Sequence, residues 1–249
     1  MDLGGRTALV TGGAARLGGA ITRGFAQAGA DVVIHYNSSA GPAETLAEEA
    51  RQLGVEALPV QANLSDPTTA SGVIDAALDR FGGVDVLVHA ASPFEPLSLS
   101  QVTLEDWRTI QGVLVESFLL LVQGLAPGMV ERGEGAVVSI LDRGAFEPWP
   151  TFLPHGVGKS ALWALTRSLA VELAPQVRIN SVIPGPVLPP PGYTEEKKQR
   201  MARTTLMERW GDPQDIVDAV LFLVQGDFIT GEALFVDGGE RWAHRRRGA

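Results

Sequence analysis

The sequence contains no cysteine, only two tyrosines, and fewer basic than acidic residues. Without cysteine, neither a disulfide nor a thiolate-bound metal can form, and we expect no metal site. The 20 lysine and arginine residues against 29 acidic ones give a formal net charge of −9 and an isoelectric point near 4.9. Nucleic acid binds to clustered positive charge, so this composition argues against a nucleic-acid partner.

Long apolar runs are also scarce. We find no N-terminal segment that resembles a signal peptide, and no run that approaches the roughly 20 residues needed to span a bilayer. We therefore expect a cytoplasmic protein with no membrane partner. The 249 residues, 45% of them hydrophobic, suit a single domain over residues 1–249. The basic cluster from Arg245 to Arg247 predicts a solvated or subunit-contacting tail over residues 240–249.

A glycine-rich stretch near the N-terminus, residues 9–20, separates an apolar run from a helical pattern. Gly12 and Gly13 allow a tight turn close to a ligand, and Gly18 allows the next helix to begin against a sheet. The unpaired amides and the dipole of that helix favour an anion, and a pyrophosphate fits best. The alternative is an ordinary glycine-rich turn between a strand and a helix.

Strand and helix patterns alternate along the whole chain. This alternation predicts a Rossmann-like, doubly wound α/β fold, with a mainly seven-stranded parallel sheet, helices on both faces and a ligand site along the C-terminal edge of the strands. The expected strands are Thr7 to Val10, Asp31 to His35, Val55 to Gln61, Val84 to His89, Ala136 to Leu141, Val177 to Ile183 and Ala233 to Val236. The expected helices are Leu17 to Ala28, Pro42 to Leu53, Pro67 to Phe81 with Asp66 as N-cap, Leu104 to Glu131, Val157 to Leu173 and Pro213 to Leu223.

Residues 184–207 form the least regular segment. Five of the ten residues from Pro184 to Tyr193 are proline. Either a flexible flap that covers the substrate or a poorly packed surface loop fits this composition.

Several motifs occur in a fixed order, and together they resemble the short-chain dehydrogenase/reductase family from Thr7 to Gly239. Besides the glycine stretch, they are Asn63-Leu64, His89-Ala90-Ala91-Ser92 where the family usually has NNAG, Arg178-Ile179-Asn180-Ser181 with Pro184-Gly185, and Val236-Asp237-Gly238-Gly239. Three features resemble pteridine reductases within that family: Arg16 in place of the usual middle glycine, the run from His35 to Ser39, and Asp142.

The resemblance implies a dinucleotide cofactor, and charge favours NADP(H). An acidic residue after the second strand would repel a 2′-phosphate, and this chain has none there. The run from His35 to Ser39 offers neutral donors instead, and Arg16 can bring a guanidinium to the same region. The expected cofactor-binding residues are Gly12, Arg16, Leu17, Gly18, His35, Tyr36, Asn37, Ser38, Ser39, Asn63, Leu64, Ala90, Ala91, Ser92, Lys159, Pro184, Gly185 and Val187.

The expected catalytic residues are Asp142, His155 and Lys159. The family uses a Tyr hydroxyl as proton donor and a Lys four residues later; this chain keeps Lys159 and has His155 at the Tyr position. Asp142 stands where the family usually has Ser, thirteen positions before His155, and Val113 stands where it usually has the Asn of a proton relay. The imidazole could donate or relay a proton with Asp142, or it could merely fill the volume of the missing Tyr.

Two functions follow from this pattern. One is an NADP(H)-dependent oxidoreductase that reduces a small carbonyl, quinone, activated alkene or pterin-like substrate by hydride transfer. The alternative is a catalytically impaired NADP(H)-binding or regulatory protein. The resemblance also implies a homotetramer or dimer, in agreement with the apolar runs at residues 119–122 and 162–169.

Overall fold

A seven-stranded parallel sheet forms the centre of the molecule in the computed structural model, which describes residues 1–190 and 192–245. The strand order is β3-β2-β1-β4-β5-β6-β7, so the direction of winding reverses between β1 and β4. This is the expected Rossmann-like fold, and the reversal opens a ligand crevice at the C-terminal ends of these strands. The strands are β1 (Thr7–Thr11), β2 (Asp31–Tyr36), β3 (Ala57–Gln61), β4 (Val86–His89), β5 (Gly135–Ile140), β6 (Val177–Pro184) and β7 (Ala233–Val236).

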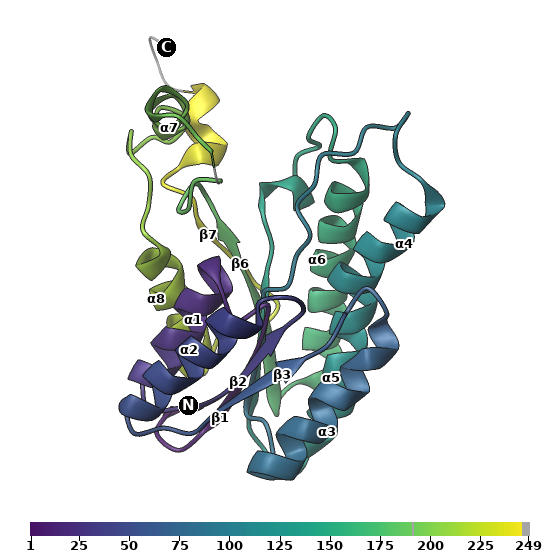
Figure 1. Ribbon diagram of the computed structural model, residues 1–249, viewed down its shortest axis with the longest axis vertical. Helices are drawn as coiled ribbons and strands as arrows, with labels where there is room; N and C mark the ends of the chain where they lie inside the picture. The colour runs from purple at the N-terminus through teal and green to yellow at the C-terminus, as the bar shows by residue number, and fades with distance from the viewer. Residues whose placement is uncertain (191, 246–249) are drawn as a thin grey trace.

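Helices cover both faces of the sheet (Figure 1), with α1, α2 and α8 on one face and α3, α5 and α6 on the other. Side chains alternate along each strand, so Val10 and Val88 pack in one core cluster while Leu9 and Leu87 pack in the other. The helices are α1 (Arg16–Gln27), α2 (Ala40–Gln52), η1 (Pro67–Thr69), α3 (Ala70–Phe81), α4 (Leu104–Gln111), η2 (Gly112–Glu116), α5 (Ser117–Arg132), η3 (Arg143–Ala145), α6 (Leu153–Leu173), α7 (Glu195–Ala202), α8 (Pro213–Gln225) and η4 (Glu240–Arg245).

The largest differences from the sequence-based prediction of helices are in three segments. The expected helix from Leu104 to Glu131 is interrupted by one π-helical turn, η2, between α4 and α5. Helix α6 begins at Leu153 rather than Val157, because Pro154 is tolerated in the first helical turn. Helix α7 lies within the segment expected to be irregular. Its N-cap, Thr194, accepts a hydrogen bond from the amide of Lys197.

The helix from Leu104 to Arg132 is long and apolar enough to cross a membrane by length and composition, because it contains an 18-residue window with a mean hydropathy of 1.8. The expectation that no such run exists is therefore wrong. Phe118, Leu121 and Met129 are fully buried and pack against one face of the sheet. The apolar composition of α5 therefore serves the core of the domain.

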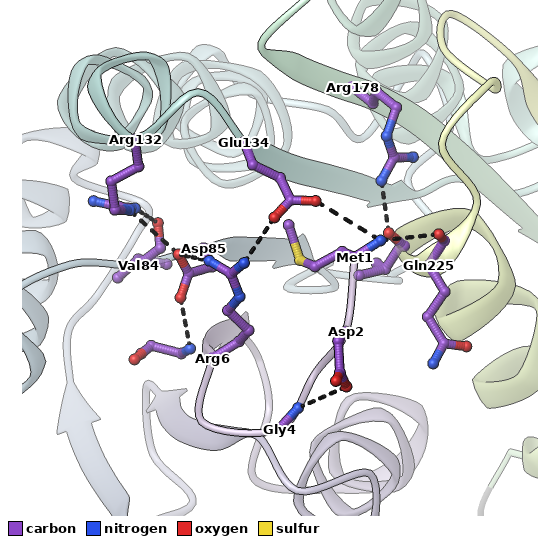
Figure 2. Close-up of polar contacts among 12 residues, drawn as sticks. Met1, Asp2, Gly4, Arg6, Val84, Asp85, Arg132, Glu134, Arg178 and Gln225 are labelled. Carbon is purple, nitrogen blue, oxygen red and sulfur yellow. Dashed lines mark hydrogen bonds and ion pairs between the residues drawn. The ribbon is translucent and has the colours of Figure 1, made fainter.

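A polar cluster ties the N-terminal ends of the strands together on the edge remote from the crevice (Figure 2). Asp85 lies between two guanidinium groups, 3.4 Å from Arg6 and 3.3 Å from Arg132, and also accepts a hydrogen bond of 3.0 Å from the amide of Thr7. Arg6 also pairs with Glu134 at 2.8 Å. One carboxylate thus links β1, the start of β4 and the end of α5.

Replacing Asp85 by alanine is expected to lower the free energy of unfolding by about 2–4 kcal/mol, because a largely buried carboxylate is removed from between two cations and an amide. Urea denaturation measures the change. Glu49→Gln is the matched control, since its pair with Arg23 is half exposed and should be worth less than about 1 kcal/mol. Equal effects of the two substitutions would contradict the structural role of Asp85.

Candidate active site

The glycine stretch forms a tight cradle between β1 and α1. Gly12 has a positive φ of 62°, and a Cβ on Gly18 would overlap the carbonyl oxygen of Gly12. The N-cap of α1 is Ala15, which supplies no side-chain cap, and among the described residues no other side chain is recorded as capping that end. The first amides of α1 are therefore available to an anion. Both features fit the pyrophosphate of a dinucleotide.

Arg16 occupies the backbone conformation that a glycine would adopt more easily. Its φ is 50°, in the left-handed region, which costs a residue with a Cβ roughly 1–2 kcal/mol. Its guanidinium lies 3.5 Å from the carbonyl oxygen of Leu188, at the mouth of the large cavity described below. The side chain therefore sits between the glycine cradle and the segment after β6, and its expected contact with a 2′-phosphate stays a prediction.

The variants Arg16→Gly and Arg16→Ala separate charge from backbone strain. Both remove the guanidinium, so we expect both to raise the Kd for NADPH at least tenfold and to leave the Kd for NADH within about twofold. Only glycine relieves the left-handed strain, so Arg16→Gly should be about 1 kcal/mol more stable than Arg16→Ala. Fluorescence titration and thermal unfolding measure the two quantities. A selective loss of NADH affinity would contradict the assignment.

His35 lies inside the fold rather than at the cofactor surface, which corrects the expectation that it binds cofactor directly. The amide of Gly12 donates to its Nδ1 at 3.1 Å, and its Nε2 lies 3.1 Å from the carbonyl oxygen of Ala62. Because a carbonyl only accepts, Nε2 carries the hydrogen and the ring is neutral. Burial lowers its pKa. His35 therefore holds the glycine cradle in place.

The other expected cofactor residues lie along the crevice. Asn37 and Ser38 are exposed after β2, Tyr36 and Ser39 are half-buried, and Asn63 is exposed while Leu64 is buried. Ala91 packs against Gly12, where a Cβ would come within 3.0 Å of its Cα. Ala90 and Ser92 flank it on the same segment. Leu17, Pro184, Gly185 and Val187 line the cavity beside Asp142.

A buried network joins β1, β4 and the π-helical turn through His89. Its Nε2 lies 3.1 Å from the carbonyl oxygen of Val113, so that nitrogen carries the hydrogen. Its Nδ1 accepts from the Thr11 hydroxyl at 3.1 Å, and the Thr11 oxygen accepts from the amides of Ala90 and Ala91. Burial lowers the pKa of His89 to about 3, and the charge of Lys159 adds to the effect. This neutral imidazole holds the Val113 turn against the end of the sheet.

His155 and Asp142 form a close pair at the end of β5. Nε2 of His155 lies 2.6 Å from Oδ2 of Asp142, and Nδ1 lies 3.0 Å from the carbonyl oxygen of Pro93. The carbonyl only accepts, so Nδ1 is protonated. Two lone pairs would repel each other at 2.6 Å, so a second proton lies between Nε2 and Oδ2. The pair therefore stores one transferable proton.

Asp142 is the member of the pair that faces the cavity. Its side chain is 19% exposed, while that of His155 is 1% exposed, and the amide of Gly144 fixes Oδ1 at 2.8 Å. Burial raises the pKa of Asp142, but the hydrogen bond from His155 and the ammonium of Lys159 outweigh it and hold the pKa below its usual value. The Asp142 carboxylate therefore accepts from His155 and Gly144 and forms the side of the pair that faces the cavity.

Lys159 lies one helical turn after His155 on α6, in its expected place. Its Nζ donates to the carbonyl oxygen of Ile140 at 2.8 Å. Burial lowers its pKa, and the nearby carboxylate of Asp142 opposes part of that shift. The ammonium thus stands behind the His155–Asp142 pair with two further hydrogens to donate.

A cavity of about 460 Å³ opens in front of Asp142. Phe94 forms one wall, stacked on Phe152 at 4.7 Å and edge-on to His155 at 5.1 Å between ring centroids. Sequence reasoning missed Trp210 and Glu240, because both come from segments far along the chain. The residues that line the cavity are Arg16, Leu17, Phe94, Asp142, Arg143, Trp149, Pro184, Gly185, Pro186, Val187, Leu188, Pro190, Tyr193, Met201, Trp210 and Glu240.

Comparison with known proteins found a matching family model and several similar proteins. The family model described as enoyl-(acyl carrier protein) reductase matches residues 13–240. An L-rhamnose 1-dehydrogenase (NAD(P)(+)) from Sphingomonas sp. is 34% identical over 245 residues, which cover 94% of this chain and 96% of that protein. Human dehydrogenase/reductase SDR family member 4 is 34% identical over 95% of this chain and 88% of that protein.

Two similar solved structures hold a cofactor. FolM alternative dihydrofolate reductase 1 from Brucella canis, complexed with NADP, superposes with a TM-score of 0.90 and 31% identity, over 96% of this chain and 95% of that one. A blue fluorescent protein from a metagenomic library, in complex with NADPH, has a TM-score of 0.89 and 31% identity, over 96% of this chain and 99% of that one.

Proposed function

Because the chain belongs to the short-chain dehydrogenase/reductase family of NAD(P)-dependent oxidoreductases, we propose that it is an NADP(H)-dependent reductase with the His155–Asp142 pair as its proton source. Its substrate is a small carbonyl, quinone, activated alkene or pterin-like molecule. The observation that carries this proposal is the 2.6 Å contact between His155 and Asp142 beside the cavity, with Lys159 behind it. The preference for NADP(H) is supported by the absence of an acidic residue after β2 and by the two NADP(H)-bound similar structures.

Each residue of the site has a separate task in this mechanism. Bound NADPH supplies the hydride. Asp142 accepts a hydrogen bond from the amide of Gly144, takes the shared proton from Nε2 of His155 and donates it to the substrate oxygen or nitrogen that gains negative charge. His155 holds that proton until it is needed, and the carbonyl of Pro93 keeps its ring in one orientation. The Lys159 ammonium stabilises the carboxylate after the proton has left.

The test is NADPH consumption by the purified protein against dihydropterins, quinones and activated carbonyls. We expect turnover with at least one class, and a much lower rate for His155→Phe with a substrate that needs an acid. Turnover that survives the substitution would assign proton donation to another group. Tight NADPH binding without consumption of any substrate would support the alternative, a cofactor-binding protein without catalysis.

We also propose a homotetramer or dimer that buries the apolar side of α5 and α6. Leu119 and Val130 on α5 are about 40% exposed and border a groove completed by Leu169 and Leu173 of α6. Light scattering measures the state, and a monomer at micromolar concentration would contradict it.

A further inference from the structure

Glu240 reaches the cavity from the far end of the chain. It begins η4, directly after the Gly238-Gly239 turn, and its side chain is 14% exposed. Nη1 of Arg143, the residue next to Asp142, lies 3.2 Å from Oε1 of Glu240. Because both Asp142 and Glu240 line the cavity, a molecule that receives a proton from Asp142 can contact Glu240 with its other end.

Only half of the Glu240 carboxylate is used by the protein. Arg143 and the hydroxyl of Thr204, at 3.3 Å, both contact Oε1. Within residues 1–190 and 192–245, no contact to Oε2 is recorded. A carboxylate oxygen has lone pairs that accept hydrogen bonds, so Oε2 can accept from a ligand in the cavity.

Two carboxylates compete for Arg143 beside the cavity. Arg143 is shared between Glu240 and Glu147, each at 3.2 Å. Burial raises the pKa of Glu240, Arg143 lowers it, and the neighbouring carboxylates of Asp237 and Glu147 raise it further. The single guanidinium of Arg143 is thus divided between two carboxylates, and Glu240 presents the carboxylate at its end of the cavity.

Aromatic side chains make the same cavity suitable for a flat ligand. Phe94, Trp149, Tyr193 and Trp210 all line it, and Trp149 lies edge-on to Phe94 with 6.2 Å between the ring centroids. Aromatic faces favour both planar rings and cations.

From these observations we propose that Glu240 sets substrate specificity, by accepting N–H hydrogen bonds at Oε2 from the amidine-like or protonated amine end of a flat substrate. The inference deepens the proposed reductase function and rests on it for the identity of the reacting end. A substrate that carries a carboxylate at that end is disfavoured.

The test is calorimetric binding of benzamidine and benzoate to the NADP⁺-loaded protein, which needs no turnover. We expect benzamidine to bind at least tenfold more tightly than benzoate. Glu240→Gln should lower benzamidine affinity at least tenfold and leave benzoate affinity unchanged or higher. Glu147→Gln is the matched control, because Glu147 also pairs with Arg143 but does not line the cavity, and should change either affinity less than threefold.

The outcomes separate this inference from the proposed function. Equal or tighter binding of benzoate, or an unchanged benzamidine affinity in Glu240→Gln, overturns the role of Glu240 whether or not the protein is a reductase. If Glu240→Gln does not fold, Glu240→Asp keeps the charge and must still prefer benzamidine. NADPH consumption with 4-amidinobenzaldehyde, 4-formylbenzoate and benzaldehyde then tests turnover. If none of them is reduced while the preference for benzamidine remains, the result contradicts the reductase function and still supports the role of Glu240.

Discussion

Asp142→Asn is expected to lower kcat for the reduction of a carbonyl or imine by about 10²- to 10⁴-fold, the usual contribution of a positioned proton donor. An amide cannot hold and release the proton that now lies between Oδ2 and Nε2 of His155. The substitution keeps the size of the side chain, so the Kd for NADPH should change less than threefold. Steady-state kinetics and a cofactor titration measure the two effects.

His155→Phe provides the companion variant. Phenylalanine fills the space of the ring between Phe94 and Phe152 but cannot store a proton, so kcat should fall to a similar level. Because the two residues act as one unit, the double variant should be no slower than the slower single variant. If the Asp142→Asn enzyme keeps more than a tenth of the wild-type rate on a carbonyl substrate, the His155–Asp142 pair is not the proton source.

The fold could be predicted from the sequence because its signals are local. Strand β7 has its predicted bounds, since turn residues bracket a short apolar run. The sequence predicts a later start for α6 than the structure shows, because Gly156 and Gly158 weaken a helical pattern. In the structure Gly158 allows close packing, as a Cβ there would approach the Leu114 side chain to 2.7 Å. The π-helical turn η2 interrupts a helix that the sequence predicts as continuous.

The candidate site was predictable where it depends on spacing along the chain. The positions of Asp142, His155 and Lys159 follow from a strand end and a helical repeat. The contact between His155 and Pro93 spans 62 residues and decides which ring nitrogen carries a hydrogen. Glu240 lies 97 positions beyond its partner Arg143, so only the folded chain brings it to the cavity.

His89 is expected to make the folding stability strongly dependent on acidity. Its pKa is about 3 in the folded protein against 6.5 for an unperturbed histidine. Above pH 6.5 neither state binds the proton; below it the unfolded chain does and the folded one does not. As the pH is lowered below 6.5, this residue alone should therefore decrease the free energy of unfolding by about 1.4 kcal/mol per pH unit. The total decrease between pH 6.5 and 3 is on the order of 5 kcal/mol. Urea denaturation at a series of pH values measures the slope.

His89→Asn isolates the contribution of this imidazole, because asparagine is the residue expected at this position in the family and its amide can still donate toward the carbonyl oxygen of Val113. Unfolding of this variant should bind about one proton fewer than unfolding of the wild type. The pH dependence of the free energy of unfolding should therefore be smaller by about 1.4 kcal/mol per pH unit between pH 6 and 4. The slope that remains includes His35, whose pKa burial also lowers. An unchanged slope would mean that His89 binds a proton in the folded state, which would require its Nδ1 to donate rather than accept and the Thr11 hydroxyl to turn away from it.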